Sequence, residues 1–138
     1  ERADLLAIHR IEQTSFPQPW PFGVFEQYLD EPGFLVADDG AVIGYVIADT
    51  VPDHRRRLGH IKDIAVRDDR RGEGIGSELL ERAIAVLEAR GIPTVKLEVR
   101  ESNDRARSLY HRHGFVHNGT VPHYYSDGED ALVLVRDE

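Results

Sequence analysis

The sequence predicts a single α/β domain in which helices flank a mixed sheet. The chain has 138 residues, which is enough for one domain with a buried core and too few for two ordinary ones. Extended apolar segments alternate with amphipathic helical segments along the chain. A hairpin precedes a strand–helix–strand unit, and such a unit needs at least one right-handed parallel crossover. These three observations define the fold class.

Two helices separated by a proline-rich loop are expected at the start. Residues 2–14 carry apolar side chains on roughly one side, which is typical of an amphipathic helix. Three prolines within five residues then fix an extended loop over 16–21, which also carries two aromatic side chains. A second helix is expected over 22–29, ended near Pro32-Gly33.

The next elements are expected strands. Residues 34–37 and 41–48 flank Asp38-Asp39-Gly40, a short hairpin signal. Residues 54–57, with the sequence His-Arg-Arg-Arg, are expected in a loop as a solvated turn, with the alternative that they attract an acidic peptide. A third strand is expected over 58–66.

The clearest helix spans 75–89, because its leucines and isoleucines form one apolar stripe. Gly91 and Pro93 end it, as a C-terminal glycine followed by a proline does. A strand over 94–99 follows, and then a helix that Ser102 or Asn103 caps and that continues to residue 113. Two further strands are expected over 115–121 and 131–135.

The composition excludes several classes of protein. A net charge of -8 argues against general nucleic-acid binding, and no apolar run is long enough to span a membrane. The chain has no cysteine, which excludes disulfides, thiolate metal sites and cysteine nucleophiles and is compatible with the cytoplasm. Two lysines, 15 arginines and many acidic residues suit either a high-salt environment or a GC-rich genome.

The most informative stretch lies between the third strand and the long helix. It contains Arg71-Gly72-Glu73-Gly74-Ile75-Gly76, and glycines at a helix start let phosphates approach unpaired backbone N–H groups at the positive end of the helix dipole. The alternative is that these glycines only permit a tight turn and close packing. The stretch lacks the Lys-Ser or Lys-Thr of a P-loop, and its spacing is too tight for the dinucleotide fingerprint.

These residues resemble the pyrophosphate-binding arm of the GNAT superfamily of N-acetyltransferases, which bind acetyl-coenzyme A (acetyl-CoA). The resemblance covers nearly the whole chain, and its C-terminal part is more specific. It is similar there to the ribosomal-protein N-terminal acetyltransferase (RimI-like) branch in Leu97-Glu98-Val99-Arg100, Ser102-Asn103, Leu109-Tyr110, Gly114-Phe115, His123-Tyr124-Tyr125 and Gly128-Glu129-Asp130-Ala131, and upstream in Ile11-Glu12-Gln13 and Pro19-Trp20.

The resemblance implies a single GNAT-type domain over residues 1–138, with a mixed, mostly antiparallel sheet whose usual first strand is missing or cut short before Arg2. It implies acetyl-CoA as cosubstrate and no metal. The residues implied to bind acetyl-CoA are Ile64, Ala65, Val66, Arg71, Gly72, Glu73, Gly74, Ile75, Gly76, Ser77 and Asn103.

The resemblance also implies the catalytic and substrate-binding residues. Glu98 matches the proposed general base, and Tyr110 matches the general acid that protonates the departing thiolate. The implied walls of the peptide-entry groove are Pro19, Trp20, Tyr124 and Tyr125.

Elementary chemistry agrees with this assignment. Acetyl transfer needs a neutral amine, a donor to the developing oxyanion and a proton for the thiolate. An α-amine with a pKa near 7.7–8.0 is roughly one-tenth neutral at pH 7, whereas a lysine is neutral about once in a few thousand molecules. An α-amine therefore needs only a weak base such as Glu98 to remove its proton. A tyrosine stays protonated at neutral pH and can donate its proton to the thiolate. Without cysteine, direct transfer is the simpler path.

Each residue also has a plainer interpretation. Glu98 could be a solvated carboxylate at a strand end, Tyr110 a core tyrosine with a wet hydroxyl, and Asn103 only a helix cap. Tyr124 and Tyr125 could pair across the terminal hairpin. The joint spacing of Glu98, Asn103 and Tyr110 favours the catalytic interpretation over these separate ones.

The sequence therefore predicts a cytoplasmic enzyme that acetylates the N-terminal α-amine of a protein, with a ribosomal protein as one candidate. The alternatives are a GNAT enzyme that acts on a small amine or a lysine side chain, and a non-catalytic CoA-binding module. No direct contact with nucleic acid or membrane is expected. Two positions depart from the family pattern: Asp63 replaces a frequent asparagine, and Lys62 a frequent apolar residue.

Overall fold

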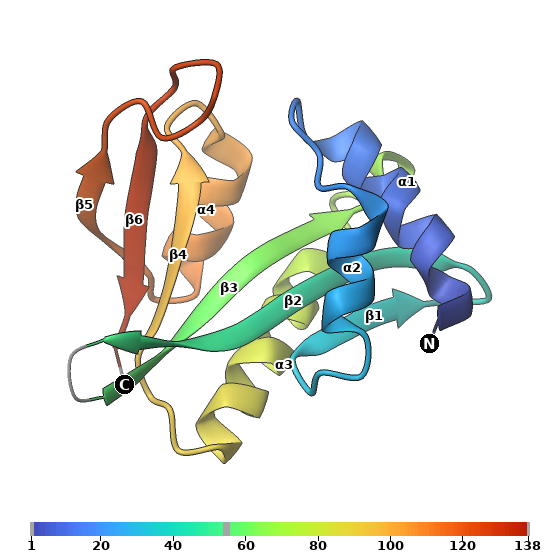
Figure 1. The fold of residues 1–138 in the computed structure, drawn as a ribbon, viewed down its shortest axis with the longest axis horizontal. Coiled ribbons are helices and arrows are strands. Elements are labelled where there is room, and N and C mark those ends of the chain that lie inside the picture. The colour runs from blue at the N-terminus through green and yellow to red at the C-terminus, as the bar shows by residue number, and fades with distance from the viewer. Residues whose placement is uncertain (1, 54–55, 138) are drawn as a thin grey trace.

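The computed structural model describes residues 2–53 and 56–137. Within them, helices flank a six-stranded sheet (Figure 1). The helices are α1 (Leu5–Ser15), α2 (Phe22–Tyr28), α3 (Ile75–Ala89) and α4 (Asp104–Arg112), with short 3-10 turns at Arg2–Asp4 and Asp68–Arg70. The strands are β1 (Phe34–Asp38), β2 (Val42–Asp53), β3 (Arg56–Val66), β4 (Val95–Arg100), β5 (Val116–Val121) and β6 (Ala131–Arg136).

The sheet is mixed and mostly antiparallel, as predicted. The strand order is β1-β2-β3-β4-β6-β5, and every neighbouring pair is antiparallel except β3 and β4. Helix α3 connects these two parallel strands. The expected crossover is therefore the β3–α3–β4 unit, which contains the glycine-rich stretch.

Strands β3 and β4 pair only briefly. Their register consists of Gly59 with Val95 and His60 with Lys96, and beyond these pairs the strands diverge (Figure 1). Pairing between β2 and β3 continues to Val66, with an irregularity where the partner of Ile47 is Asp63 and that of Ala48 is Ile61. The edge of β3 that faces β4 is thus left without a strand partner over residues 61–66, where a wedge opens in the sheet.

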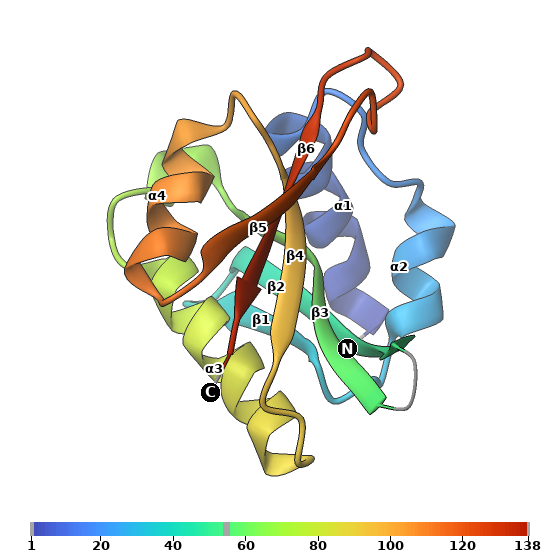
Figure 2. The same ribbon diagram turned by 90° about the vertical axis from the view of Figure 1, so that its left-hand side faces the viewer.

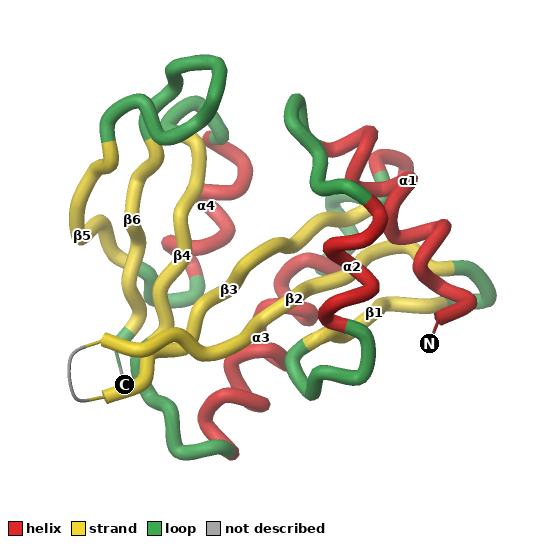
Figure 3. The backbone as a smooth tube through the Cα atoms, in the orientation of Figure 1, coloured by secondary structure: helices red, strands yellow, loops and turns green. Residues whose placement is uncertain are grey.

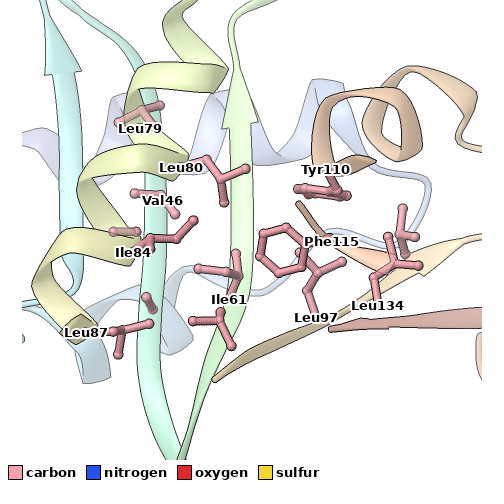
Figure 4. Close-up of a cluster of buried hydrophobic side chains, with 14 of the residues drawn as sticks. Val46, Ile61, Leu79, Leu80, Ile84, Leu87, Leu97, Tyr110, Phe115 and Leu134 are labelled. Carbon is pink, nitrogen blue, oxygen red and sulfur yellow. The ribbon is translucent and has the colours of Figure 1, made fainter. Parts of the chain in front are cut away.

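Two hydrophobic cores lie on opposite faces of the sheet. Helices α3 and α4 cover one face, and α1 and α2 cover the other (Figures 2 and 3). Side chains of β2 alternate between them, since Val46 packs with α3 whereas Tyr45 and Ile47 pack under α1 and α2. Figure 4 shows the first core, in which Leu80 and Ile84 of α3 lie over the strands.

The prediction of a loop over residues 54–57 is partly wrong. Strand β2 continues to Asp53 and β3 begins at Arg56, so Arg56 and Arg57 belong to a long hairpin, and residues 54 and 55 lie outside the described ones. The pairing of Pro52 with Arg57 extends the ladder beyond the apolar segment that indicated the strands. Pairing with a neighbouring strand is a long-range property, and hydropathy along the chain does not report it.

Candidate active site

A large cavity of about 640 Å³ lies between the end of β3, the start of α3 and one side of α4. Every residue implied to bind acetyl-CoA lines it except Glu73, whose carboxylate pairs with Arg70 instead. Its lining comprises Ser15, Phe16, Ile64, Ala65, Val66, Arg70, Arg71, Gly72, Gly74, Ile75, Gly76, Ser77, Asn103, Arg105, Ala106, Ser108, Leu109, Tyr110 and Arg112.

The glycine-rich stretch gives this cavity an open backbone cradle. Gly72 and Gly74 have φ values of 85° and 82°, a left-handed conformation that costs other residues strain. No side chain caps the N-terminus of α3 at Gly74. Helix N–H groups and the positive end of the dipole thus face the cavity. Arg70 and Arg71 also line it, with their guanidinium groups paired to acidic side chains nearby. Such a cradle suits a polyphosphate.

A second cavity of about 180 Å³ lies in the wedge between β3 and β4. Five residues line both cavities, so the two meet at Phe16, Ile64, Asn103, Ala106 and Tyr110. The remaining lining of the smaller cavity is Glu12, Gln18, Trp20, Ile61, Lys62, Asp63, Leu97, Glu98, Val99, Arg100 and Tyr125. The divergence of the two parallel strands therefore joins the cavities through the sheet.

Glu98 lines the smaller cavity and is held by two basic side chains. Its Oε1 lies 2.7 Å from His60 Nε2 and its Oε2 lies 3.3 Å from Lys96 Nζ. The hydrogen bond with His60 lowers the pKa of Glu98, assisted by the charge of Lys96 and opposed by burial. Glu98 is therefore an ionised, oriented carboxylate with 15% of its side chain exposed.

His60 is a partner of Glu98 that was not predicted from the sequence. The pairing of His60 with Lys96 places His60 beside β4, near Glu98 two residues further along that strand. The only sequence signal is the position of His60 within the third strand, because the parallel register that brings the side chains together is non-local.

Tyr110 comes from α4 and lines both cavities. Its ring packs on Phe115 with centroids 5.9 Å apart (Figure 4). Burial raises the pKa of Tyr110, and the nearby Asp63 and Tyr125 raise it further. The hydroxyl is therefore protonated at any physiological pH.

Asn103 has a structural role and a place in the site. Its Oδ1 accepts a hydrogen bond of 3.2 Å from the backbone N–H of Ala106, which caps α4. The same residue lines both cavities. Because the cap fixes the start of α4, it also positions Tyr110 two turns further along the helix.

Two of the four residues implied to contact the peptide line the smaller cavity. Trp20 and Tyr125 do so, whereas Pro19 and Tyr124 are exposed outside it. The Arg100 guanidinium lies 4.0 Å from the centroid of the Tyr125 ring. The two loops that carry the four residues lie at the same end of the molecule (Figures 1 and 2).

Arg100 connects these two loops. Its Nη1 donates to Asp127 and Glu129, each at 2.8 Å, and its Nη2 donates to Gln18 at 3.3 Å. The 126–130 segment and the α1–α2 loop are thereby joined at the rim of the smaller cavity. Only 12% of the Arg100 side chain is exposed, so it forms part of the cavity wall.

Within residues 2–53 and 56–137, no helix is long and apolar enough to cross a bilayer. In the same ranges no three His, Cys, Asp or Glu side chains gather as metal ligands.

The chain is similar to known acetyltransferases. The model of the acetyltransferase (GNAT) family matches residues 5–115. The N-alpha-acetyltransferase of Sulfolobus acidocaldarius is 36% identical over 145 residues, a match that covers 96% of this chain and 86% of that protein. The ribosomal protein bS18-alanine N-acetyltransferase of Escherichia coli K12 is 36% identical over 142 residues, covering 97% of this chain and 91% of that one.

The fold is also that of a solved relative. The crystal structure of Ard1 from Thermoplasma volcanium has a TM-score of 0.90 and 28% identity, and the match covers 99% of this chain and 93% of that one. A family model that spans most of the chain, with relatives this similar over nearly its whole length, shows that the chain belongs to the acetyltransferase (GNAT) family, enzymes that use acetyl-CoA.

Proposed function

We propose that this protein transfers the acetyl group of acetyl-CoA to the N-terminal α-amine of a protein. The observation that carries the proposal is the junction of the two cavities at Tyr110, with Glu98 on the wall of the smaller one. The names of the relatives support the same reaction, since one is an N-alpha-acetyltransferase and another acetylates an alanine of ribosomal protein bS18.

The larger cavity is the proposed acetyl-CoA site. Its residues fit the cosubstrate, because the uncapped start of α3 and the left-handed glycines leave backbone N–H groups accessible to the pyrophosphate. The unpaired edge of β3 over residues 61–66 offers backbone groups to the pantetheine arm. Acetyl-CoA would supply the thioester, and Tyr110, one of the residues that line both cavities, would lie beside it where the cavities meet.

Glu98 is the proposed proton acceptor. An α-amine is already about one-tenth neutral at pH 7, so the ionised carboxylate needs to receive one proton, directly or through a water molecule. His60, hydrogen-bonded to Glu98, keeps the carboxylate oriented. On the other side of the junction, the Tyr110 hydroxyl donates its proton to the departing thiolate.

The smaller cavity favours a chain terminus over a folded surface as the acceptor. It is small, at about 180 Å³, and is bordered by Trp20 and Tyr125 from two separate loops. A terminal residue fits such a space, with its first side chain against the aromatic wall. A ribosomal protein N-terminus that begins with a small residue such as alanine is the first substrate to test, in view of the Escherichia coli relative.

A peptide assay tests this function. The enzyme is incubated with acetyl-CoA and one of three substrates: a peptide with a free N-terminus and an internal lysine, the same peptide with a blocked N-terminus, and a polyamine. Fragmentation mass spectrometry locates the acetyl group. We expect acetylation of residue 1 of the free peptide and at least a hundredfold less product from the other two, in keeping with the different amine pKa values.

Two outcomes would contradict the proposal. Acetylation confined to lysine or to the polyamine would make the protein an acetyltransferase of another acceptor class. Binding of acetyl-CoA without turnover on any amine would support the non-catalytic module.

A further inference from the structure

Glu12 is a buried carboxylate on α1 with no place in the proposed acetyl transfer. Only 2% of the residue is exposed, yet it lines the smaller cavity. Its Oε1 accepts a hydrogen bond of 2.5 Å from the Tyr45 hydroxyl, and its Oε2 accepts one of 2.8 Å from the backbone N–H of Trp20. A charged group is buried only where such bonds compensate for lost hydration.

The hydrogen bond from Trp20 ties the backbone of the α1–α2 loop to α1. Pro17, Pro19 and Pro21 have no backbone N–H, so Gln18 and Trp20 supply the backbone donors of residues 17–21. Of these two donors, Trp20 gives its hydrogen to Glu12. The Trp20 ring packs on Phe25 and Tyr28, with centroids 5.5 and 6.0 Å apart, and its backbone is held by a carboxylate eight residues earlier in the chain.

Asp63 lies next to Glu12 and is itself protonated, as the hydrogen bonds of Tyr45 indicate. The Tyr45 hydroxyl has one hydrogen but lies 2.5 Å from Glu12 Oε1 and 3.3 Å from Asp63 Oδ2. Both contacts are hydrogen bonds only if the second carboxyl carries a proton. Burial, followed by the adjacent Glu12, raises the pKa of Asp63 well above its usual range. Asp63 is therefore the carboxyl that carries the proton in its contact with Tyr45.

The surroundings of this pair contain few compensating charges. Tyr45 of β2 is neutral, because burial and the two carboxyls raise its pKa. The other ionisable groups that line the cavity are Lys62 of β3, Glu98 and Arg100 of β4, Tyr110 of α4 and Tyr125. Glu98 and Arg100 have their own partners in His60 and the acids of the 126–130 segment.

We propose that Glu12 is a positioning residue for the acceptor peptide. It holds the Trp20 backbone and so fixes one wall of the peptide cavity. The contacts of Tyr45 with Glu12 and Asp63 keep the Glu12 carboxylate in place. The identity of the peptide rests on the proposed function, but the positioning of Trp20 does not. Glu12 acts through Trp20, and loss of the Asp63 proton would place two adjacent carboxylates in repulsion and release the loop.

Trp20 is the one tryptophan of the chain and provides a readout that needs no substrate. We expect Glu12→Gln to shift its fluorescence emission to longer wavelength and to increase quenching by acrylamide, because an amide has one oxygen for the two donors. The KM for an acceptor peptide should rise about tenfold. This ratio corresponds to the free energy of a hydrogen bond to a charged group, taken at the weak end of its range. The KM for acetyl-CoA should change less than twofold.

Glu78→Gln is the matched control, because Glu78 is exposed on α3 and pairs only with Arg82 among the described ion pairs. It should leave Trp20 emission unchanged. Unchanged emission and peptide KM in Glu12→Gln would overturn the proposal. A shifted emission with an unchanged peptide KM would overturn the link from the loop to the substrate. A protein that acetylates no amine, but whose Trp20 responds as expected, would contradict only the proposed function.

Asp63→Asn tests the proton independently and keeps the proposal falsifiable if Glu12→Gln does not fold. As pH rises through the raised pKa of Asp63, the wild-type emission should move to longer wavelength. Asparagine cannot lose a proton there, so the variant should not show this transition. The same alkaline transition in both proteins, with circular dichroism showing both folded, would overturn the role of Asp63.

Discussion

Tyr110 and Glu98 occupy different places relative to the two cavities. Tyr110 lines both, whereas Glu98 lines only the smaller one. The two groups also differ in charge: burial keeps the tyrosine protonated, and His60 keeps the glutamate ionised. An acid and a base that share one site need such separation of their pKa values.

Tyr110→Phe tests the proposed acid. Phenylalanine keeps the packing on Phe115 and removes only the hydroxyl. We expect kcat to fall about a hundredfold, the lower end of the range for a general acid, with KM for acetyl-CoA nearly unchanged. Steady-state kinetics measure both constants. Turnover as fast as wild type would exclude the proton-donor role.

The lowered pKa of Glu98 has a consequence for stability. Its unfolded pKa is about 4.3, so its folded-state ion pair stabilises the protein above that pH and the contribution disappears as pH falls through the lower folded pKa. Urea unfolding of wild type and Glu98→Gln should therefore show a stability difference that shrinks below about pH 4. Exposed Glu78→Gln is the control. A stability difference that grows as the pH falls would mean that the pKa of Glu98 is raised in the folded protein, not lowered.

At the scale of elements, sequence periodicity was informative because it reflects local burial. The apolar stripe of α3 and the capping signal of α4 predicted both helices, and the bounds of α3 agree with the expected 75–89. Strand pairing was harder to predict from the sequence. The length of the β2–β3 hairpin and the divergence of β3 from β4 depend on contacts between distant residues. No local pattern encodes them.

Two substitutions of Asn103 distinguish its role as a helix cap from a role in binding acetyl-CoA. Asn103→Ala removes the bond to Ala106 and should cost about 1 kcal/mol of stability. Asn103→Ser keeps a good cap and should retain that stability. If the amide also binds acetyl-CoA, both variants should raise the KM for acetyl-CoA severalfold. A KM that rises only in the alanine variant would assign Asn103 to the cap alone.

At the scale of the whole molecule, the sheet itself makes the site. Glycines, Glu98 and Tyr110 could be selected from the sequence through their family resemblance. The sequence did not predict that the two cavities join where the sheet opens, nor that Glu12, Tyr45 and Asp63 form a buried group from three elements. Glu12 and Tyr45 look like ordinary residues of a helix and a strand, and only tertiary structure brings them together.

We propose that acetyl-CoA and the acceptor peptide occupy two cavities that meet at Tyr110. A conjugate that links the sulfur of CoA through an acetyl group to the N-terminus of an acceptor peptide tests it most directly. Initial-rate inhibition kinetics should show competition with acetyl-CoA and with the peptide, and binding tighter than either part alone. Inhibition that is competitive with acetyl-CoA but unaffected by peptide concentration would contradict the claim.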